Sequence, residues 1–148
     1  MRTLTMVAGL LLVASTAFAY RADGILGSWH TKNNKSIVQI YQCGPDLCGK
    51  IISLKEPVYT KASEGPIGRP KFDKNNSDPA LRSRPIIGMQ IMSGCEVTGN
   101  NELENGHIYD PESGNTYKLN VKLENPHTLK LRGFIGFSLL GRTEYWTR

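Results

Sequence analysis

The stretch Tyr117-Lys-Leu-Asn-Val-Lys-Leu-Glu124 alternates apolar and polar side chains along its whole length. Successive side chains of a β-strand point to opposite faces of a sheet, so this pattern predicts a strand with one buried and one solvated face. Asn125-Pro126 interrupts the pattern, and the same alternation resumes in Thr128-Leu-Lys-Leu-Arg132. The two segments together predict a β-hairpin.

Strand-like runs recur on both sides of this hairpin, separated by Gly, Pro and Asn. They cover residues 25–31, 36–43, 47–54, 86–92, 106–109 and 142–147. No segment shows a sustained helical period. Short strands in hairpin order predict an all-β fold, a single antiparallel up-and-down barrel of about eight strands. Closing such a barrel pairs the first strand with the last and leaves neither edge exposed.

The first residues predict a secretory signal peptide rather than a part of the fold. Arg2 supplies a positive start, residues 6–13 are apolar, and Ala17-Phe-Ala19 is a small-x-small cleavage motif. We therefore expect cleavage after Ala19 and a periplasmic or secreted barrel domain over residues 20–148. No later stretch approaches the roughly 18 consecutive apolar residues that a membrane-spanning helix needs.

The charge of the chain is mildly basic. It has 18 Lys and Arg against 13 Asp and Glu, and loss of Arg2 with the signal peptide leaves an excess of four positive charges. The basic residues are scattered and do not alternate with aromatic residues, as a groove for single-stranded nucleic acid would require. We therefore expect no nucleic-acid partner.

Three cysteines in an exported chain leave one without a partner. Cys43 and Cys48 flank a Gly-Pro-Asp turn, where facing strands bring two side chains within bonding reach, and we predict a disulfide between them. The alternative, a redox-active pair, lacks the Cys-x-x-Cys spacing. Cys95 is then either a small buried apolar side chain or a reactive or intermolecular thiol.

A long connection at residues 55–85 interrupts the regular spacing of strands. Its residues Asp73, Asn75, Ser77 and Asp78 resemble the opening of a calcium-binding loop, and Asn76 is a further candidate of the same segment. The twelfth position is Arg84 instead of Glu, which excludes an EF-hand. An irregular calcium site and a set of Asx turns in a loop that folds across the barrel mouth remain as alternatives, and we assign no metal site.

Seven short motifs follow one another through the chain. They are Gly-Ser-Trp at residues 27–29 and the segments 47–51, 73–79, 82–88, 108–117, 131–136 and 141–148. In order and spacing they resemble the family of exported bacterial proteins catalogued as domain of unknown function 2147. This resemblance covers nearly all of the mature chain. It implies a periplasmic or secreted lipocalin-like barrel and no established reaction.

The same resemblance implies a structural role for both ends of the barrel domain. In lipocalin-like barrels the Trp of Gly-x-Trp lies across the closed end, beneath a basic side chain from the last strand. Trp29 is therefore expected to close the barrel. Arg142, Trp146 and Arg148 share one face of the last strand by alternation, so either arginine is a candidate partner for the indole.

Catalytic patterns are weak in this sequence. His30, His107 and His127 come with no evident partner, and the Gly-x-Ser-x-Gly nucleophile motif is missing. No cluster has zinc-ligand spacing, and no Gly-rich loop precedes a helix. Enzymatic activity is therefore uncertain and not expected, and we predict no cofactor.

The leading hypothesis is that the protein binds a small apolar or amphipathic ligand in the barrel. Arg82 and Arg84 are candidate rim contacts for an acidic head group. The candidate lining residues come from the inward faces of the strands: Met89, Ile91, Tyr117, Leu119, Val121, Leu129 and Leu131. The alternative is that these residues form a packed core with no cavity. The protein would then be an envelope-associated interaction or structural protein that uses the 55–85 loop.

Overall fold

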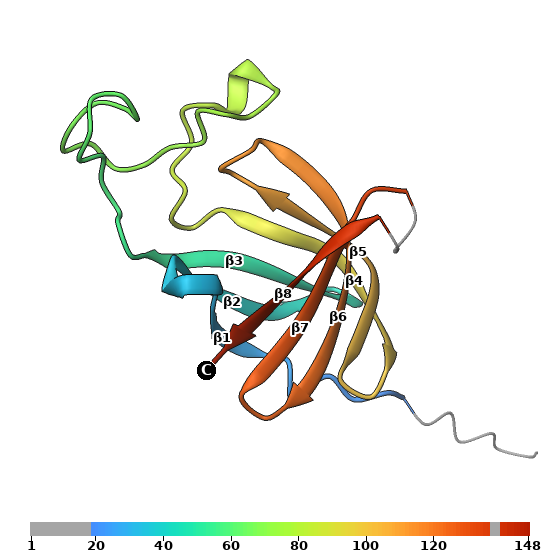
Figure 1. The fold of residues 1–148 in the computed structure, drawn as a ribbon. Coiled ribbons are helices and arrows are strands. Elements are labelled where there is room, and N and C mark those ends of the chain that lie inside the picture. The colour runs from blue at the N-terminus through green and yellow to red at the C-terminus, as the bar shows by residue number, and fades with distance from the viewer. Residues whose placement is uncertain (1–18, 137–139) are drawn as a thin grey trace, which may run out of the picture.

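The computed structural model describes residues 19–136 and 140–148. Eight antiparallel strands follow one another in chain order and close into a barrel, as the sequence predicts (Figure 1). The strands are β1 (Gly27–His30), β2 (Ser36–Cys43), β3 (Asp46–Leu54), β4 (Gln90–Gly99), β5 (Glu102–Asp110), β6 (Asn115–Asn125), β7 (Thr128–Phe134) and β8 (Gly141–Thr147). Two short 3-10 turns, η1 (Lys32–Asn34) and η2 (Pro79–Leu81), lie in the connections.

The hairpin that the alternating pattern predicts is formed by β6 and β7. Val121 faces Leu131 and Leu123 faces Leu129 across the two strands. The apolar side of this ladder belongs to the hydrophobic core, and the lysines between these positions point outward. The barrel interior is thus filled from both strands of the hairpin.

The boundaries of β4 and β5 differ from the prediction. The structure places the start of β4 at Gln90, because Ile86 to Met89 still belong to the preceding loop. β5 begins at Glu102, four residues earlier than the expected run. Bulges break the alternation in both strands: Gly94 and Asn105 adopt positive φ angles, of 60° and 58°. An interrupted period of two hides a strand from pattern analysis.

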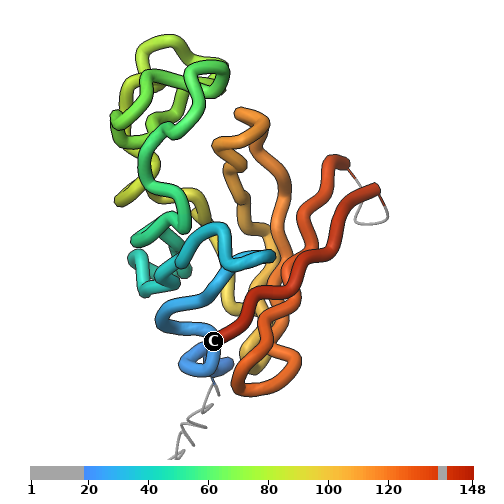
Figure 2. Tube along the Cα trace, turned by 60° about the vertical axis from the view of Figure 1, so that its left-hand side comes forward, coloured from blue at the N-terminus to red at the C-terminus, as the bar shows by residue number. Residues whose placement is uncertain are grey.

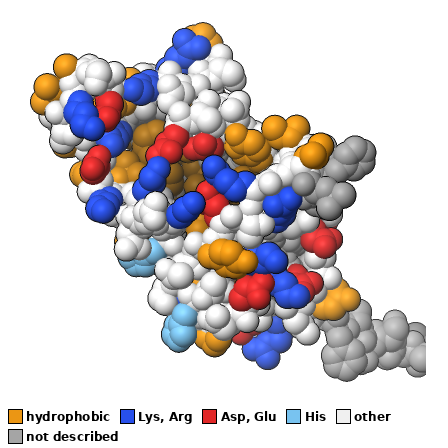
Figure 3. All heavy atoms as spheres, in the orientation of Figure 1, with side chains coloured by type: hydrophobic (Ala, Val, Ile, Leu, Met, Phe, Trp, Pro, Cys, Tyr) orange, Lys and Arg blue, Asp and Glu red, His pale blue; other side chains and the backbone are white. Residues whose placement is uncertain are grey.

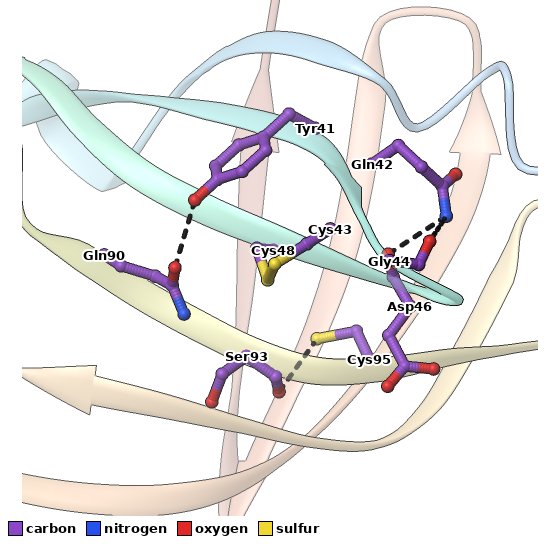
Figure 4. Close-up of a disulfide and its surroundings, with 9 residues drawn as sticks. All are labelled: Tyr41, Gln42, Cys43, Gly44, Asp46, Cys48, Gln90, Ser93 and Cys95. Atoms are coloured by element: carbon purple, nitrogen blue, oxygen red, sulfur yellow. Dashed lines mark hydrogen bonds between the residues drawn. A yellow bond between two sulfur atoms is a disulfide. The ribbon is translucent and has the colours of Figure 1, made fainter.

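A disulfide joins Cys43 to Cys48 at the turn between β2 and β3, as predicted (Figure 4). Cys95 lies on the neighbouring β4 and is buried and free. Burial, with a further contribution from the charge of Asp46, raises the pKa of this thiol to about 11. Cys95 is therefore a neutral core side chain at physiological pH, and a reactive thiolate is disfavoured.

The connections divide between the two ends of the barrel. One end carries the β2–β3, β4–β5 and β6–β7 turns and the C-terminus. The other end, here called the mouth, carries η1, the connection between β3 and β4, and the β5–β6 and β7–β8 turns. Figure 2 shows the β3–β4 connection standing beyond the strands at the mouth, beside the β5–β6 turn. In the described part of the chain, no helix is both long and apolar enough to cross a membrane.

Candidate functional site

The closed end of the barrel is sealed by an indole and a guanidinium group. Trp29 is fully buried, and its indole N–H donates to the carbonyl of Ile25 at 2.8 Å. The guanidinium of Arg148 lies over the Trp29 ring, 4.1 Å from its centroid. It also donates to the carbonyls of Gly24, Leu26 and Pro126 at 2.9–3.0 Å. Arg148, and not Arg142, therefore occupies the position over Trp29.

Arg142 lies at the other end of β8. It shares a strand face with Trp146 and Arg148, but six residues of extended chain separate it from Arg148 by roughly 20 Å. Its side chain is mostly exposed and forms an ion pair with Glu144 at 3.0 Å. Alternation assigned the correct face to Arg142. Its distance along the strand excludes it from the closed end.

The middle of the barrel is packed with the side chains that were candidates to line a cavity. Of those candidates only Tyr117 is half-buried. The others are at most 8% exposed and belong to one hydrophobic core: Met89, Ile91, Leu119, Val121, Leu129 and Leu131. These residues fill the interior, as the packed-core alternative anticipates.

The mouth half of the barrel is built differently from the closed half. β1 pairs with β8 at one position only, His30 with Thr147, whereas β7 pairs with β8 at seven positions. From Gly141 to Trp146, β8 therefore has no ladder partner on the β1 side. The barrel opens along this part of β8.

This open part of β8 turns charged side chains toward the interior. Glu144 faces Leu131 and Arg142 faces Gly133, on the same side of the ladder as the buried pair of Leu129 and Trp146. Gly133 also faces Leu119 of β6 and contributes no side chain. At this position, therefore, no side chain of β7 fills the inner face of the sheet between β6 and β8.

Tyr117 completes this group on the neighbouring strand. It lies two residues before Leu119, on the same face of β6, and its Cβ is the nearest atom to a Cβ placed on Gly133, at 3.8 Å. Tyr117, Arg142 and Glu144 thus face inward around Gly133, and we call them the mouth cluster. Figure 3 shows a hollow at this end with apolar side chains at its base and Lys, Arg, Asp and Glu around it.

The arginines expected to bind a head group, Arg82 and Arg84, are occupied by the loop itself. Arg82 donates to the carbonyl of Asn76 at 2.7 Å. Arg84 forms an ion pair with Asp73 at 2.9 Å and lies 5.7 Å from the ring centroid of Tyr109. Neither guanidinium belongs to the mouth cluster, and no sequence pattern indicated Arg142 in their place.

A buried carboxylate holds the 55–85 loop in one conformation. Asp73 has no exposed surface, and its oxygens accept from the Tyr109 hydroxyl at 2.6 Å, Asn76 at 2.8 Å and Arg84 at 2.9 Å. Burial, followed by the hydrogen bond and charge of Asp73, raises the pKa of Tyr109 to about 12. These four residues, here called the latch, are Asp73, Asn76, Arg84 and Tyr109. Tyr109 lies 36 residues from Asp73 in the sequence, so only the folded structure brings it into the latch.

The remaining loop candidates also make structural contacts. Asn75 donates to the carbonyls of Pro111 and Glu112, which binds the loop to the β5–β6 turn. Asn76 accepts from the backbone N–H of Asp78, and Asp78 accepts from that of Ala80, in the Asx turns that were the alternative to a calcium site. Within residues 19–136 and 140–148, no group of three or more His, Cys, Asp or Glu gathers to hold a metal ion.

Two surface hollows lie outside the barrel interior. One, of about 330 Å³, is formed by the loop itself, with Arg69, Lys71, Phe72 and three prolines around it. The other, of about 290 Å³, lies on the outer wall of β5, β6 and β7, next to His107 and Lys118.

The family described as "Uncharacterized protein conserved in bacteria (DUF2147)" matches residues 27–148. The chain belongs to this family. The DUF2147 chain also resembles a solved structure titled "Protein HP1028 from the human pathogen Helicobacter pylori belongs to the lipocalin family". The two share 21% sequence identity at a TM-score of 0.70, over 88% of this chain and 84% of that one. Among curated proteins, no match to the sequence is found.

The comparisons agree with the geometry on the fold. At this level of identity the structural likeness supports a lipocalin-like barrel, and the DUF2147 match supports the resemblance carried by the seven motifs. A shared fold does not determine function, which depends on the residues of the site. Polar groups gather beside apolar surface at the mouth cluster, in the loop and in the outer hollow next to His107.

Proposed function

We propose that this DUF2147 protein is an exported binding protein that takes a small amphipathic or apolar ligand at the mouth of its barrel. The observation that carries the proposal is the open stretch of β8, where Arg142 and Glu144 face the interior without a partner strand from β1. Ligand sites combine apolar surface with a few convergent polar groups, and they occur in the mouths of β-barrels.

The chemistry of the mouth cluster favours an acidic head group. The guanidinium of Arg142 pairs with Glu144 and is three-quarters exposed, so a carboxylate or sulfonate can reach it. Tyr117 offers a ring face and a hydroxyl beside it. Because Leu119 and Leu131 close the path deeper into the barrel, the apolar part of the ligand is expected to be short and to lie in the mouth.

Export is part of the proposal. The family match begins at residue 27, after the predicted signal peptide, of which residues 1–18 lie outside the described part of the chain. The disulfide between Cys43 and Cys48 is consistent with an oxidising compartment, such as the bacterial periplasm. These two features support the proposed periplasmic or secreted location.

A fluorescence titration with anilinonaphthalene sulfonate, an anionic amphipathic probe, tests the proposal. Arg142→Ala should weaken probe binding about tenfold, the effect of losing one charge-assisted hydrogen bond. Gly133→Leu should block the mouth. A Cβ at Gly133 makes only an ordinary contact with Tyr117, so this variant is expected to fold.

Lys118→Ala is the matched control, because Lys118 carries the same charge on the outer face of β6. It should bind the probe as the wild type does. Wild-type binding by both Arg142→Ala and Gly133→Leu would refute the mouth site. A loss confined to Lys118→Ala would place the probe in the outer hollow beside His107.

A second candidate function rests on the loop. The packed barrel and the latched 55–85 segment are what an interaction protein would need: a rigid scaffold that presents one ordered surface. This candidate retains export and requires no cavity. It predicts that the probe titration is insensitive to both mouth variants.

A further inference from the structure

We propose that the 55–85 loop is a docking surface for an anionic lipid bilayer, which holds the mouth end of the barrel against a membrane. The proposal does not depend on a ligand at the mouth. It rests on the charge of the loop, on the apolar side chains at its outer edge, and on the rigidity that the latch gives it.

The positive charge of the mature chain is concentrated in this loop. Residues 55–85 contain seven Lys and Arg against four Asp and Glu, an excess of three. The mature chain as a whole has an excess of four, so the barrel contributes little to it. A positive surface this compact attracts an anionic membrane from within a Debye length, about 10 Å at moderate ionic strength.

Two aliphatic side chains of the loop are exposed to solvent. Ile67 is 66% exposed and Leu81, at the end of η2, is 39% exposed. Leu81 is followed directly by Arg82, and Ile67 lies two residues before Arg69. Figure 3 shows apolar side chains at the outer edge of the loop with Lys and Arg beside them. Apolar contacts flanked by cations are the combination that binds proteins to the interface of an anionic bilayer.

The loop is ordered before it binds. The side chain of Tyr59 is buried against Phe72, with ring centroids 5.4 Å apart, and two isolated bridges pair Val58 with Pro70 and Phe72 with Pro85. The latch fixes the second half of the loop through Asp73. A surface that is already rigid loses little conformational entropy on docking.

The hollow in the loop supplies a seat for a lipid phosphate. Arg69 and Lys71 border it, and Phe72 and neighbouring prolines form its apolar wall. Lys71 lies 3.6 Å from Glu56, and Arg69 is exposed. Guanidinium groups bind phosphate through two parallel hydrogen bonds, so Arg69 is the expected contact. Ile67, two residues away, would then enter the interface beside the bound head group.

Co-sedimentation of the full mature protein with vesicles tests the proposal. The protein should pellet with vesicles of phosphatidylcholine mixed with phosphatidylglycerol, and not with phosphatidylcholine alone. Arg69→Gln should weaken the partition coefficient about fivefold, the effect of one basic residue at an anionic surface. Ile67→Ser should also weaken it, and raised salt should reduce the binding of every form.

Controls of matched chemistry lie on the barrel wall. Lys118→Gln removes an exposed charge from β6, and Tyr145→Ser removes an exposed apolar side chain, 53% accessible, from β8. Both should bind vesicles as the wild type does, and so should Arg142→Ala, which separates this test from that of the mouth site. Equal binding to neutral and anionic vesicles, or wild-type binding by both Arg69→Gln and Ile67→Ser, would overturn the proposal.

Discussion

At the scale of single residues, Asp73 shows how a charge can be kept in the interior of a surface loop. A buried carboxylate is costly unless donors satisfy its oxygens. Here Arg84 balances the charge, and Asn76 and Tyr109 supply two further hydrogen bonds. The Tyr109 hydroxyl must remain protonated to donate its hydrogen bond to Asp73, so the stability of the latch depends on pH.

Alkaline pH should therefore weaken the latch. The pKa of Tyr109 is raised to about 12 in the folded protein, above its ordinary value of 10.0. The stabilising effect is complete below pH 10 and is lost as the pH rises from 10 to about 12, because the unfolded chain ionises first. Absorbance of tyrosinate should show a late component that Tyr109→Phe removes.

Asp73→Asn provides the control for this titration. It removes the negative charge that contributes to the raised pKa of Tyr109 and leaves an oxygen that can still accept the hydroxyl. The late component should shift to lower pH without disappearing. An unchanged titration in Tyr109→Phe would contradict the assignment.

At the scale of elements, the connection between β3 and β4 behaves as an ordered unit in its own right. In its first half, the backbone N–H of Tyr59 donates a hydrogen bond to the carbonyl of Arg69. In its second half, the backbone N–H of Asp73 donates to the carbonyl of Arg84. It is tied to the β5–β6 turn through Asn75, which leaves room only for a glycine at position 114. The latch adds a second connection to the same hairpin, because Asp73 and Arg84 contact Tyr109 of β5.

Removing the Asp73 carboxylate should release the loop and spare the barrel. Asp73→Ala leaves Tyr109 and Asn76 without their acceptor, at a cost of about 1–3 kcal/mol. Hydrogen exchange should accelerate at the amides of residues 71–86 and remain slow in β6 and β7. Asp78→Ala, which removes only the cap of η2, should have a smaller effect. Acceleration spread evenly over the barrel would contradict a local latch.

Pattern analysis succeeds for elements that keep a strict period. β6, β7 and the Cys43 to Cys48 turn were predicted from neighbouring residues, because alternation and loop length are local properties. The bulge at Gly94 broke the period in β4 and hid its second half, and the bulge at Asn105 hid the first half of β5. The latch and the mouth cluster join residues from separate elements, so their assembly depends on barrel register, which no local pattern specifies.

At the scale of the whole molecule, the barrel is unevenly closed. A single residue pair, His30 with Thr147, joins the first strand to the last. The closed end is held instead by side chains, since Arg148 binds the segment before β1 and the β6–β7 turn at once. This arrangement leaves the mouth half free to open along β8.

Arg148→Ala should therefore destabilise the entire barrel. The variant loses a stacked cation over Trp29 and charge-assisted hydrogen bonds to three carbonyls, at a cost of about 1–3 kcal/mol for a site near solvent. Thermal unfolding should show a midpoint lowered by several degrees, with one cooperative transition. Arg142→Ala, which removes the same charge from the mouth end of β8, should leave the midpoint almost unchanged because its ion pair with Glu144 is solvated. Equal losses in the two variants would mean that the net charge of β8, and not the cover over Trp29, stabilises the closed end.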